Sequence, residues 1–109
     1  MTPAEFKARR EAMGLSTQWL ATRWNVSLMS VQRWERNRSM PSGLAEDFET
    51  IEDGFCEDVG MGICESLPVL RVPRVDSDSD DGFPAAYHRA IALRIAERTG
   101  AQLVFGGEP

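Results

Sequence analysis

The side chains between residues 28 and 33 are of types that could read the edges of DNA base pairs. Arg33 can donate two parallel hydrogen bonds to guanine O6 and N7, and Gln32 can pair in the same way with adenine N6 and N7. Ser30 can reach a phosphate or a base edge, and an apolar side chain can contact the methyl group of thymine. The predicted base-contacting set is Leu28, Met29, Ser30, Gln32 and Arg33.

The residues around this set predict two short helices joined by a turn. Ser16 and Ser27 are residue types that cap helix N-termini, and Asn25 between them tolerates the left-handed backbone that such a turn needs. Val31 and Trp34 lie three apart and so share the inward face of the second helix. The base-contacting set then points outward, as a helix in a DNA major groove requires. The predicted inward side of the first of these helices is Leu20, Ala21 and Trp24.

A structural role is the alternative for this segment, with Leu28 and Met29 buried and no DNA contact. Trp19 also has two interpretations: packing against the first helix of the chain, or a contact residue. Residues at the start of the first of these helices and just past the end of the second are predicted to touch DNA phosphates, because basic and hydroxyl side chains and helix N-termini bind them. These are Ser16, Thr17, Arg36, Asn37 and Arg38, and a solvated basic loop is the alternative for the last three.

The net charge of −5 is unevenly distributed along the 109 residues. Residues 1–40 carry seven Lys and Arg against three carboxylates, a net +4, and residues 41–109 carry five Arg against fourteen carboxylates, a net −9. Such asymmetry is typical of a chain with one end that faces nucleic acid. Incidental clustering in an acidic protein is the alternative.

Other helices are predicted on both sides of this segment. Thr2 is predicted to cap a helix that begins at Pro3 and ends near Met13, before Gly14. Glu5 would reach back to Thr2 and complete a capping box. A further helix opens at 41–42, and glycines within and after its apolar stripe predict fraying or a bend beyond Phe55. The stripe is Leu44, Phe48, Ile51 and Phe55, and the glycines are Gly54, Gly60 and Gly62.

The chain changes character after residue 65. A strand over 67–72, an acidic loop over 76–82, a helix over 84–99 that stops at Gly100 and a strand over 101–105 are predicted. Because a strand–helix–strand unit is too small to be stable alone, we expect it to pair with the same segment of a second subunit. The predicted dimerisation residues are Leu70, Val72, Tyr87, Ile91, Ile95, Leu103 and Phe105.

The predicted fold is therefore mainly α with a small α+β tail. A four-to-five-helix helix-turn-helix domain would occupy residues 1–65, and a strand-helix-strand dimerisation region would occupy residues 66–109. No run approaches the ~20 apolar residues of a membrane span, and the N-terminus lacks the pattern of a secretory signal, so a cytoplasmic location is expected.

The sequence offers no pattern typical of an enzyme, so we expect no catalytic residues, metal or cofactor. Cys56 and Cys64 lack the spacing of a zinc site and are expected to be reduced thiols, with a regulatory disulfide as the alternative. His88 is expected to be a polar helix residue. The alternating aspartates of the 76–82 loop depart from a calcium-binding loop at its sixth and twelfth positions, which favours a solvated turn.

Residues 14–37, GLSTQWLATRWNVSLMSVQRWERN, resemble the helix-turn-helix of the Cro/C1-type (XRE) repressor family. The resemblance extends with the flanking helices over residues 2 to about 55. It implies that the set at 28–33 faces the bases and that the protein binds a two-fold operator as a homodimer. Three positions depart from the family pattern, and the first of them puts one phosphate contact in doubt: Thr17, Trp24 and Asn25.

The whole layout is similar to the compact YdiL-like repressors, among them the anti-CRISPR-associated autoregulators of phages. This similarity implies a homodimeric repressor of its own operon, acting on a double-stranded DNA operator in a bacterial cell and encoded by a phage or mobile element. An antitoxin whose acidic tail neutralises a toxin protein is the first alternative. A pure protein-interaction module that binds no DNA is the second.

Overall fold

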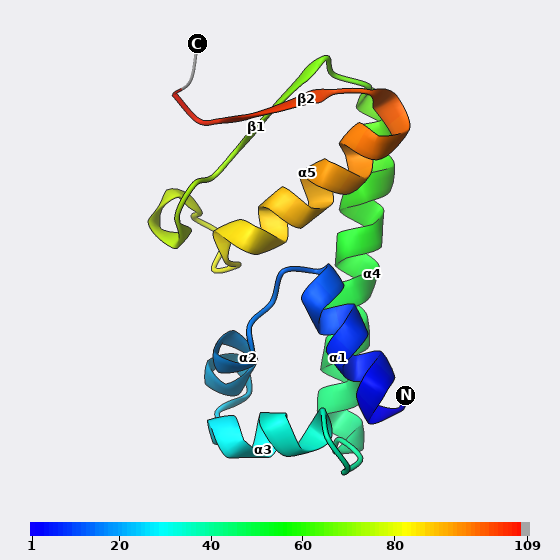
Figure 1. Cartoon of the computed structure of the whole chain (residues 1–109), viewed down its shortest axis with the longest axis vertical. Helices are drawn as coiled ribbons and strands as arrows, with labels where there is room; N and C mark the ends of the chain where they lie inside the picture. Colours follow the sequence, from blue (N-terminus) through cyan, green and yellow to red (C-terminus); the bar gives the residue numbers. More distant parts are fainter. Residues whose placement is uncertain (108–109) are drawn as a thin grey trace.

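Five α-helices and two short strands follow one another in the computed structural model, which describes residues 1–107. The longest helix, α4, runs along the length of the molecule, with α1, α2 and α3 at one end and α5, β1 and β2 at the other (Figure 1). This arrangement confirms the predicted class, mainly α with a small α+β tail. The elements are α1 (Pro3–Ala12), α2 (Thr17–Trp24), α3 (Leu28–Trp34), α4 (Ser42–Glu65), β1 (Val69–Val72), the 3₁₀ turn η1 (Asp76–Asp78), α5 (Ala85–Thr99) and β2 (Gln102–Phe105).

Side-chain caps begin each of the first three helices, as the sequence predicts. The Thr2 hydroxyl accepts a hydrogen bond from the Glu5 N–H at 3.1 Å, and the Glu5 carboxylate accepts one from the Thr2 N–H at 3.2 Å. Ser16 Oγ accepts from the backbone N–H three residues on at 3.0 Å, and Ser27 Oγ does the same at 3.1 Å. Asn25 ends α2 with φ = 52°, the left-handed turn between the two helices. Local chemistry thus sets the boundaries of the helix-turn-helix.

The prediction that the fourth helix frays or bends after Phe55 is wrong. Helix α4 continues unbroken for 24 residues and ends where Ser66 takes the left-handed conformation, φ = 51°. Glycine costs a helix about 1 kcal/mol per residue relative to alanine, and tertiary packing on α5 offsets that cost. Gly62 has a specific use, because a Cβ there would lie 2.1 Å from Ile95 Cδ1 of α5.

One hydrophobic core crosses the predicted boundary between residues 65 and 66. Buried residues of α1, α2, α3 and α4 form a single cluster with Tyr87, Ile91 and Ile95 of α5. The Phe55 ring of α4 meets the Tyr87 ring at 5.5 Å between centroids. The boundary stays a prediction, but the tail is packed on α4 in the single chain.

Strands β1 and β2 are parallel neighbours, with α5 connecting them in the chain. The register pairs Val69 with Gln102 and Val72 with Phe105. Parallel strands need such a crossover, since no tight turn can join them. Helix α5 lies between the sheet and the end of the molecule that contains α3 (Figure 1).

Four predicted dimerisation residues are corrected by their burial within the chain. Tyr87, Ile91 and Ile95 pack in the core, and Val72 is 7% exposed. The sequence predicts that a partner subunit covers the apolar stripe of α5, whereas α4 of the same chain extends far enough to cover it. Leu70, Leu103 and Phe105 are half-buried.

Candidate nucleic-acid interface

The side chains of α3 divide into a buried face and an outward face. Val31 is completely buried, whereas Leu28 is 37% exposed and Met29 58% exposed. Gln32 and Arg33 are exposed as well. The alternative that buries Leu28 and Met29 is therefore wrong. We call the outward set Leu28, Met29, Gln32 and Arg33 the α3 surface.

The remaining residue of the predicted base-contacting set belongs partly to the helix cap. Ser30 is half-buried, and its Oγ lies 2.9 Å from Ser27 Oγ. On the α3 surface itself, Arg33 Nη2 lies 3.4 Å from Met29 Sδ, so the guanidinium lies back along the helix. The structure thus brings four of the five predicted residues to one exposed surface, and it ties Ser30 to the turn.

A partly buried ion pair that the sequence reasoning missed holds the C-terminal end of α3 against α1. Arg10 Nε donates to Glu35 Oε1, and both side chains are 12% exposed. Arg10 Nη1 also donates to the carbonyl oxygen of Leu15 at 2.7 Å. The guanidinium therefore connects α1, the loop before α2 and the end of α3. Two signals in the sequence could have indicated this pair. Arg10 lies at the inward spacing of α1, and Glu35 is the only carboxylate between residues 12 and 45.

A second polar cluster fixes α2 to α4. Arg23 donates to the Asp47 carboxylate at 2.8 and 3.2 Å, and Trp24 Nε1 donates to the same carboxylate at 2.7 Å. The hydrogen bond from Arg23 holds the pKa of Asp47 below its ordinary value, and the pKa of Arg23 is raised in turn. Trp24, predicted on the inward side of its helix, is half-buried with its indole N–H paired.

The predicted phosphate-contacting residues flank the α3 surface. Arg36, Asn37 and Arg38 are exposed, and the Asn37 and Arg38 N–H groups both donate to the Arg33 carbonyl, at 3.0 and 3.1 Å. Within residues 1–107, no ion pair joins Arg33, Arg36 or Arg38 to a carboxylate. This end of the molecule therefore presents one cation on α3 and two on the turn that follows it.

The two hydroxyl residues at the start of α2 differ in availability. Ser16 is exposed but its Oγ is engaged by the helix cap, and Thr17 is half-buried. Both lie at the N-terminus of α2, next to the turn that leads into it. The phosphate assignment of these two residues stays a prediction.

Trp19 contacts the tail, which neither of its two interpretations predicted. Its Nε1 donates to the Gly82 carbonyl at 3.0 Å, and its ring lies 5.1 Å from the ring of Phe83. The backbone at Gly14, φ = +72°, approaches the start of α5 so closely that a Cβ there would lie 2.4 Å from the Ala86 carbonyl oxygen. The helix-turn-helix and the tail are thus in direct contact.

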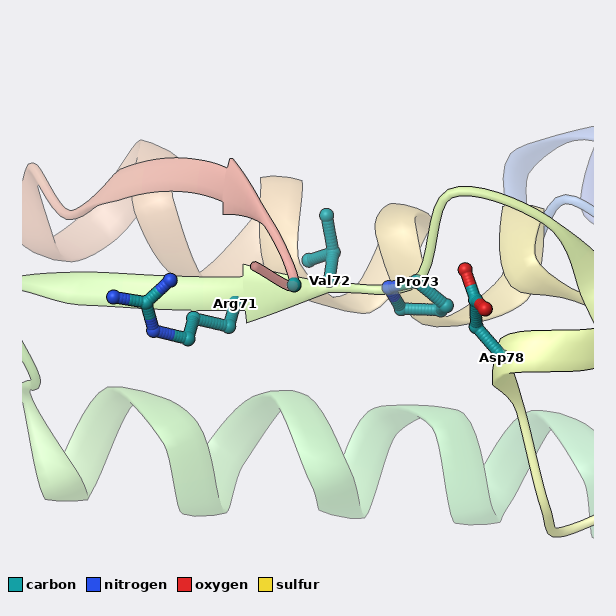
Figure 2. Close-up of a pocket in the computed structure, with 5 residues that line it drawn as sticks. Arg71, Val72, Pro73 and Asp78 are labelled. Atoms are coloured by element: carbon teal, nitrogen blue, oxygen red, sulfur yellow. The ribbon is translucent and has the colours of Figure 1, made fainter. Parts of the chain in front are cut away.

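A hollow lies beside β1, at the opposite end of the molecule from α3. It has a volume of about 440 Å³, and Figure 2 shows Arg71 and Asp78 on opposite sides of Val72 and Pro73. The Asp78 carboxylate accepts the backbone N–H groups of Arg74 and Val75, both at 3.3 Å. The hollow is lined by Arg71, Val72, Pro73, Asp78 and Gly106.

The two cysteines form no disulfide among residues 1–107, and aspartates of the acidic loop lie within hydrogen-bond distance of neighbouring residues. Cys56 and Cys64 are free and exposed. His88 Nε2 lies 3.0 Å from Asp81 Oδ1, and Asp76 Oδ1 accepts the Ala85 N–H at 2.8 Å. Within the described residues, no His, Cys, Asp or Glu side chains gather as a metal site, and no helix has the length and apolar character to cross a membrane.

Comparisons with models of known families, with curated proteins and with solved structures gave no match for this chain.

Proposed function

We propose that this protein is a sequence-specific, double-stranded DNA-binding repressor that acts as a homodimer on a two-fold operator. The observation that supports this proposal most directly is the outward projection of Leu28, Met29, Gln32 and Arg33 from a helix whose opposite face is buried. A helix with this division of faces can enter a major groove and still be held rigidly by the protein. The resemblance of residues 14–37 to the Cro/C1-type helix-turn-helix supports the same proposal.

The charge around α3 suits a duplex. Arg33 lies on the α3 surface, and Arg36 and Arg38 follow it on the turn. The one carboxylate among them, Glu35, forms an ion pair with Arg10. Most of the excess negative charge lies elsewhere: α4 contains eight carboxylates and no Lys or Arg. Affinity for DNA would come mainly from phosphate contacts, and sequence preference from Arg33 and Gln32.

The direct test measures binding to DNA fragments from upstream of the protein's own gene, by fluorescence anisotropy at two salt concentrations. We expect affinity that falls steeply with salt, and protection mapping of the bound DNA should show a footprint with two-fold symmetry. The Arg33→Ala variant should lose about 1–3 kcal/mol on the specific site and relax base preference at one position. The Arg38→Ala variant should weaken binding to all sequences alike.

Arg98→Ala provides the matched control, because Arg98 is an exposed arginine near the end of α5, away from α3. It should leave both affinities unchanged. Binding that ignores Arg33 and Arg38, or that responds equally to Arg98, would show that the α3 surface is not the DNA interface. No salt-dependent binding at all would favour a protein-interaction module.

A further inference from the structure

Among residues 1–107, strand β2 pairs with another strand on one edge, and we call its other edge the open edge. The N–H groups of Gln102 and Gly106 donate to the carbonyls of Pro68 and Val72 at 2.9 and 3.1 Å, so alternate residues of β2 face β1. In a parallel ladder the intervening residues direct their N–H and C=O groups to the other side. The backbone groups of Leu103 and Phe105 therefore form the outer edge of the two-stranded sheet.

Nothing in the sequence of β2 protects this edge. Gln102–Phe105 contains no charge and no proline, the devices by which edge strands avoid pairing with another chain. Strand β1 differs, since Pro68 and Pro73 flank it and Arg71 lies within it. Of the two outer edges, β2 is the one suited to accept a further strand.

Apolar side chains continue the open edge onto α5. A hollow of about 170 Å³ lies beside β2, lined by Val72, Arg89, Leu103, Val104 and Phe105. Leu93 lies one helical turn after Arg89 on the same stripe of α5 and is 54% exposed. Backbone donors and acceptors thus lie next to uncovered apolar surface.

We propose that the open edge of β2 pairs antiparallel with β2 of a second copy of this chain, forming a continuous four-stranded sheet. Leu103 would exchange both backbone hydrogen bonds with Phe105 of the second copy, and Val104 would lie on the two-fold axis. Leu93 would flank the junction from each subunit. A two-fold interface of this kind is self-complementary, because the same strand supplies donors and acceptors to its copy.

The position of the sheet in the molecule favours this second copy over another partner. When two sheets join edge to edge, the two-fold axis is perpendicular to the sheet. Helix α5 and the α3 end lie on the same side of the sheet (Figure 1), so this axis leaves both α3 surfaces at one end of the dimer. A two-fold operator requires that arrangement. The inference deepens the proposed function by naming the surface that joins the subunits, and its tests use no DNA.

A cysteine at the two-fold axis tests the register. In a Cys56→Ser, Cys64→Ser background, Val104→Cys should form an intermolecular disulfide under mild oxidation, since directly opposed residues of this type have Cα atoms about 4.5 Å apart. Gln102→Cys is the control in the same strand. Its copies would lie four residues apart in register, about 14 Å, too far to bridge. Equal cross-linking at both positions would overturn the register.

Proline at each outer edge tests which strand pairs. Leu103→Pro removes an outward N–H without touching the ladder to β1 and should raise the dimer dissociation constant at least about 10-fold in sedimentation experiments. Arg71→Pro makes the matched change on β1 and should leave dimerisation unchanged. Leu103→Ala separates loss of the side chain from loss of the N–H, and circular dichroism confirms that each variant folds.

The outcomes separate this inference from the proposed function. A dimer that is sensitive to Arg71→Pro and insensitive to Leu103→Pro would overturn the choice of β2. A wild-type chain that stays monomeric at high micromolar concentration would overturn the pairing itself. A monomeric chain would also remove the homodimer from the proposed function, but neither result bears on salt-dependent DNA binding through α3, which the anisotropy experiment measures separately.

Discussion

The two ends of this molecule expose different kinds of groups. At the α3 end the backbone is satisfied by the Ser16 and Ser27 caps, and side chains project into solvent. At the sheet end the side chains of Leu103 and Phe105 are half-buried, and backbone groups of β2 form the open edge. Side chains can discriminate among base pairs, whereas an open strand edge recognises another extended strand. The contrast teaches that, under the proposed function, sequence reading and self-association would be divided between the two ends of one small chain.

The largest test breaks the α3 end alone. Arg10→Ala leaves Glu35 partly buried without its partner, so we expect the free energy of unfolding to fall by about 3–5 kcal/mol. Chemical denaturation followed by tryptophan fluorescence measures it. Arg9→Ala is the control: the Arg9 side chain is 41% exposed beside Glu5 and Glu52, and its loss should cost less than about 1 kcal/mol. Equal costs would mean that the Arg10–Glu35 pair does not hold α3.

The next test breaks the contact between the two ends. Gly14→Ala would place a Cβ 2.4 Å from the Ala86 carbonyl oxygen at a positive φ, so it should cost more than the ~1–2 kcal/mol of left-handed strain alone. Gly100→Ala is matched in backbone conformation, φ = +78°, but meets no atom within 4 Å, and should show the strain alone. Thermal unfolding of both variants gives the difference. If the two substitutions cost the same, the close approach of the loop to α5 is not needed for stability.

Low pH should weaken the α3 end, because the Asp47 carboxylate accepts hydrogen bonds from Arg23 and Trp24 there. Its folded pKa lies below the ordinary 3.8, so its contribution is present above the unfolded pKa and is lost as the pH falls through the folded pKa. Asp47→Asn keeps an acceptor for the Trp24 indole and should cost about 1 kcal/mol at neutral pH. The wild-type advantage should shrink below pH 3.8. A pH-independent difference would show that the charge of Asp47 is not responsible.

The smallest expected effect concerns the glycines of α4. Gly60→Ala meets no atom within 4 Å and should stabilise the protein by about 0.5–1 kcal/mol through helix propensity. Gly62→Ala should give no such gain, since its Cβ would collide with the Ile95 side chain at 2.1 Å. Differential scanning calorimetry of the two variants compares them. Equal stabilisation would mean that α4 and α5 can separate at no cost.

The sequence predicted those parts of the fold that depend on neighbouring residues. The capping types Thr2, Ser16 and Ser27, the turn at Asn25 and the stop at Gly100 all act through hydrogen bonds or backbone conformations within a few residues. The four exposed residues of α3 followed from the same logic, because the inward positions of a short helix determine its outward ones.

The parts that the sequence did not predict depend on residues distant in the chain. Arg10 and Glu35 are 25 residues apart, and Trp19 and Gly82 are 63 apart. The Tyr87, Ile91 and Ile95 stripe correctly predicted an apolar face, but periodicity does not say what covers such a face. The continuity of α4 through its glycines depended on that same packing. The base-reading and phosphate roles stay predictions, as does the homodimer.

The unbroken helix α4 has a consequence for the spacing of any operator. Its 24 residues form a rod of about 36 Å whose lower part lies beside α1, α2 and α3 and whose upper part packs on α5. One inserted residue would lengthen the rod by about 1.5 Å and turn its far end by about 100°. In a dimer joined through the sheet end, the length of α4 and the rotation between its two ends would set the distance between two operator half-sites. A change in its length should alter which DNA spacing is accepted while leaving the bases read by each subunit the same.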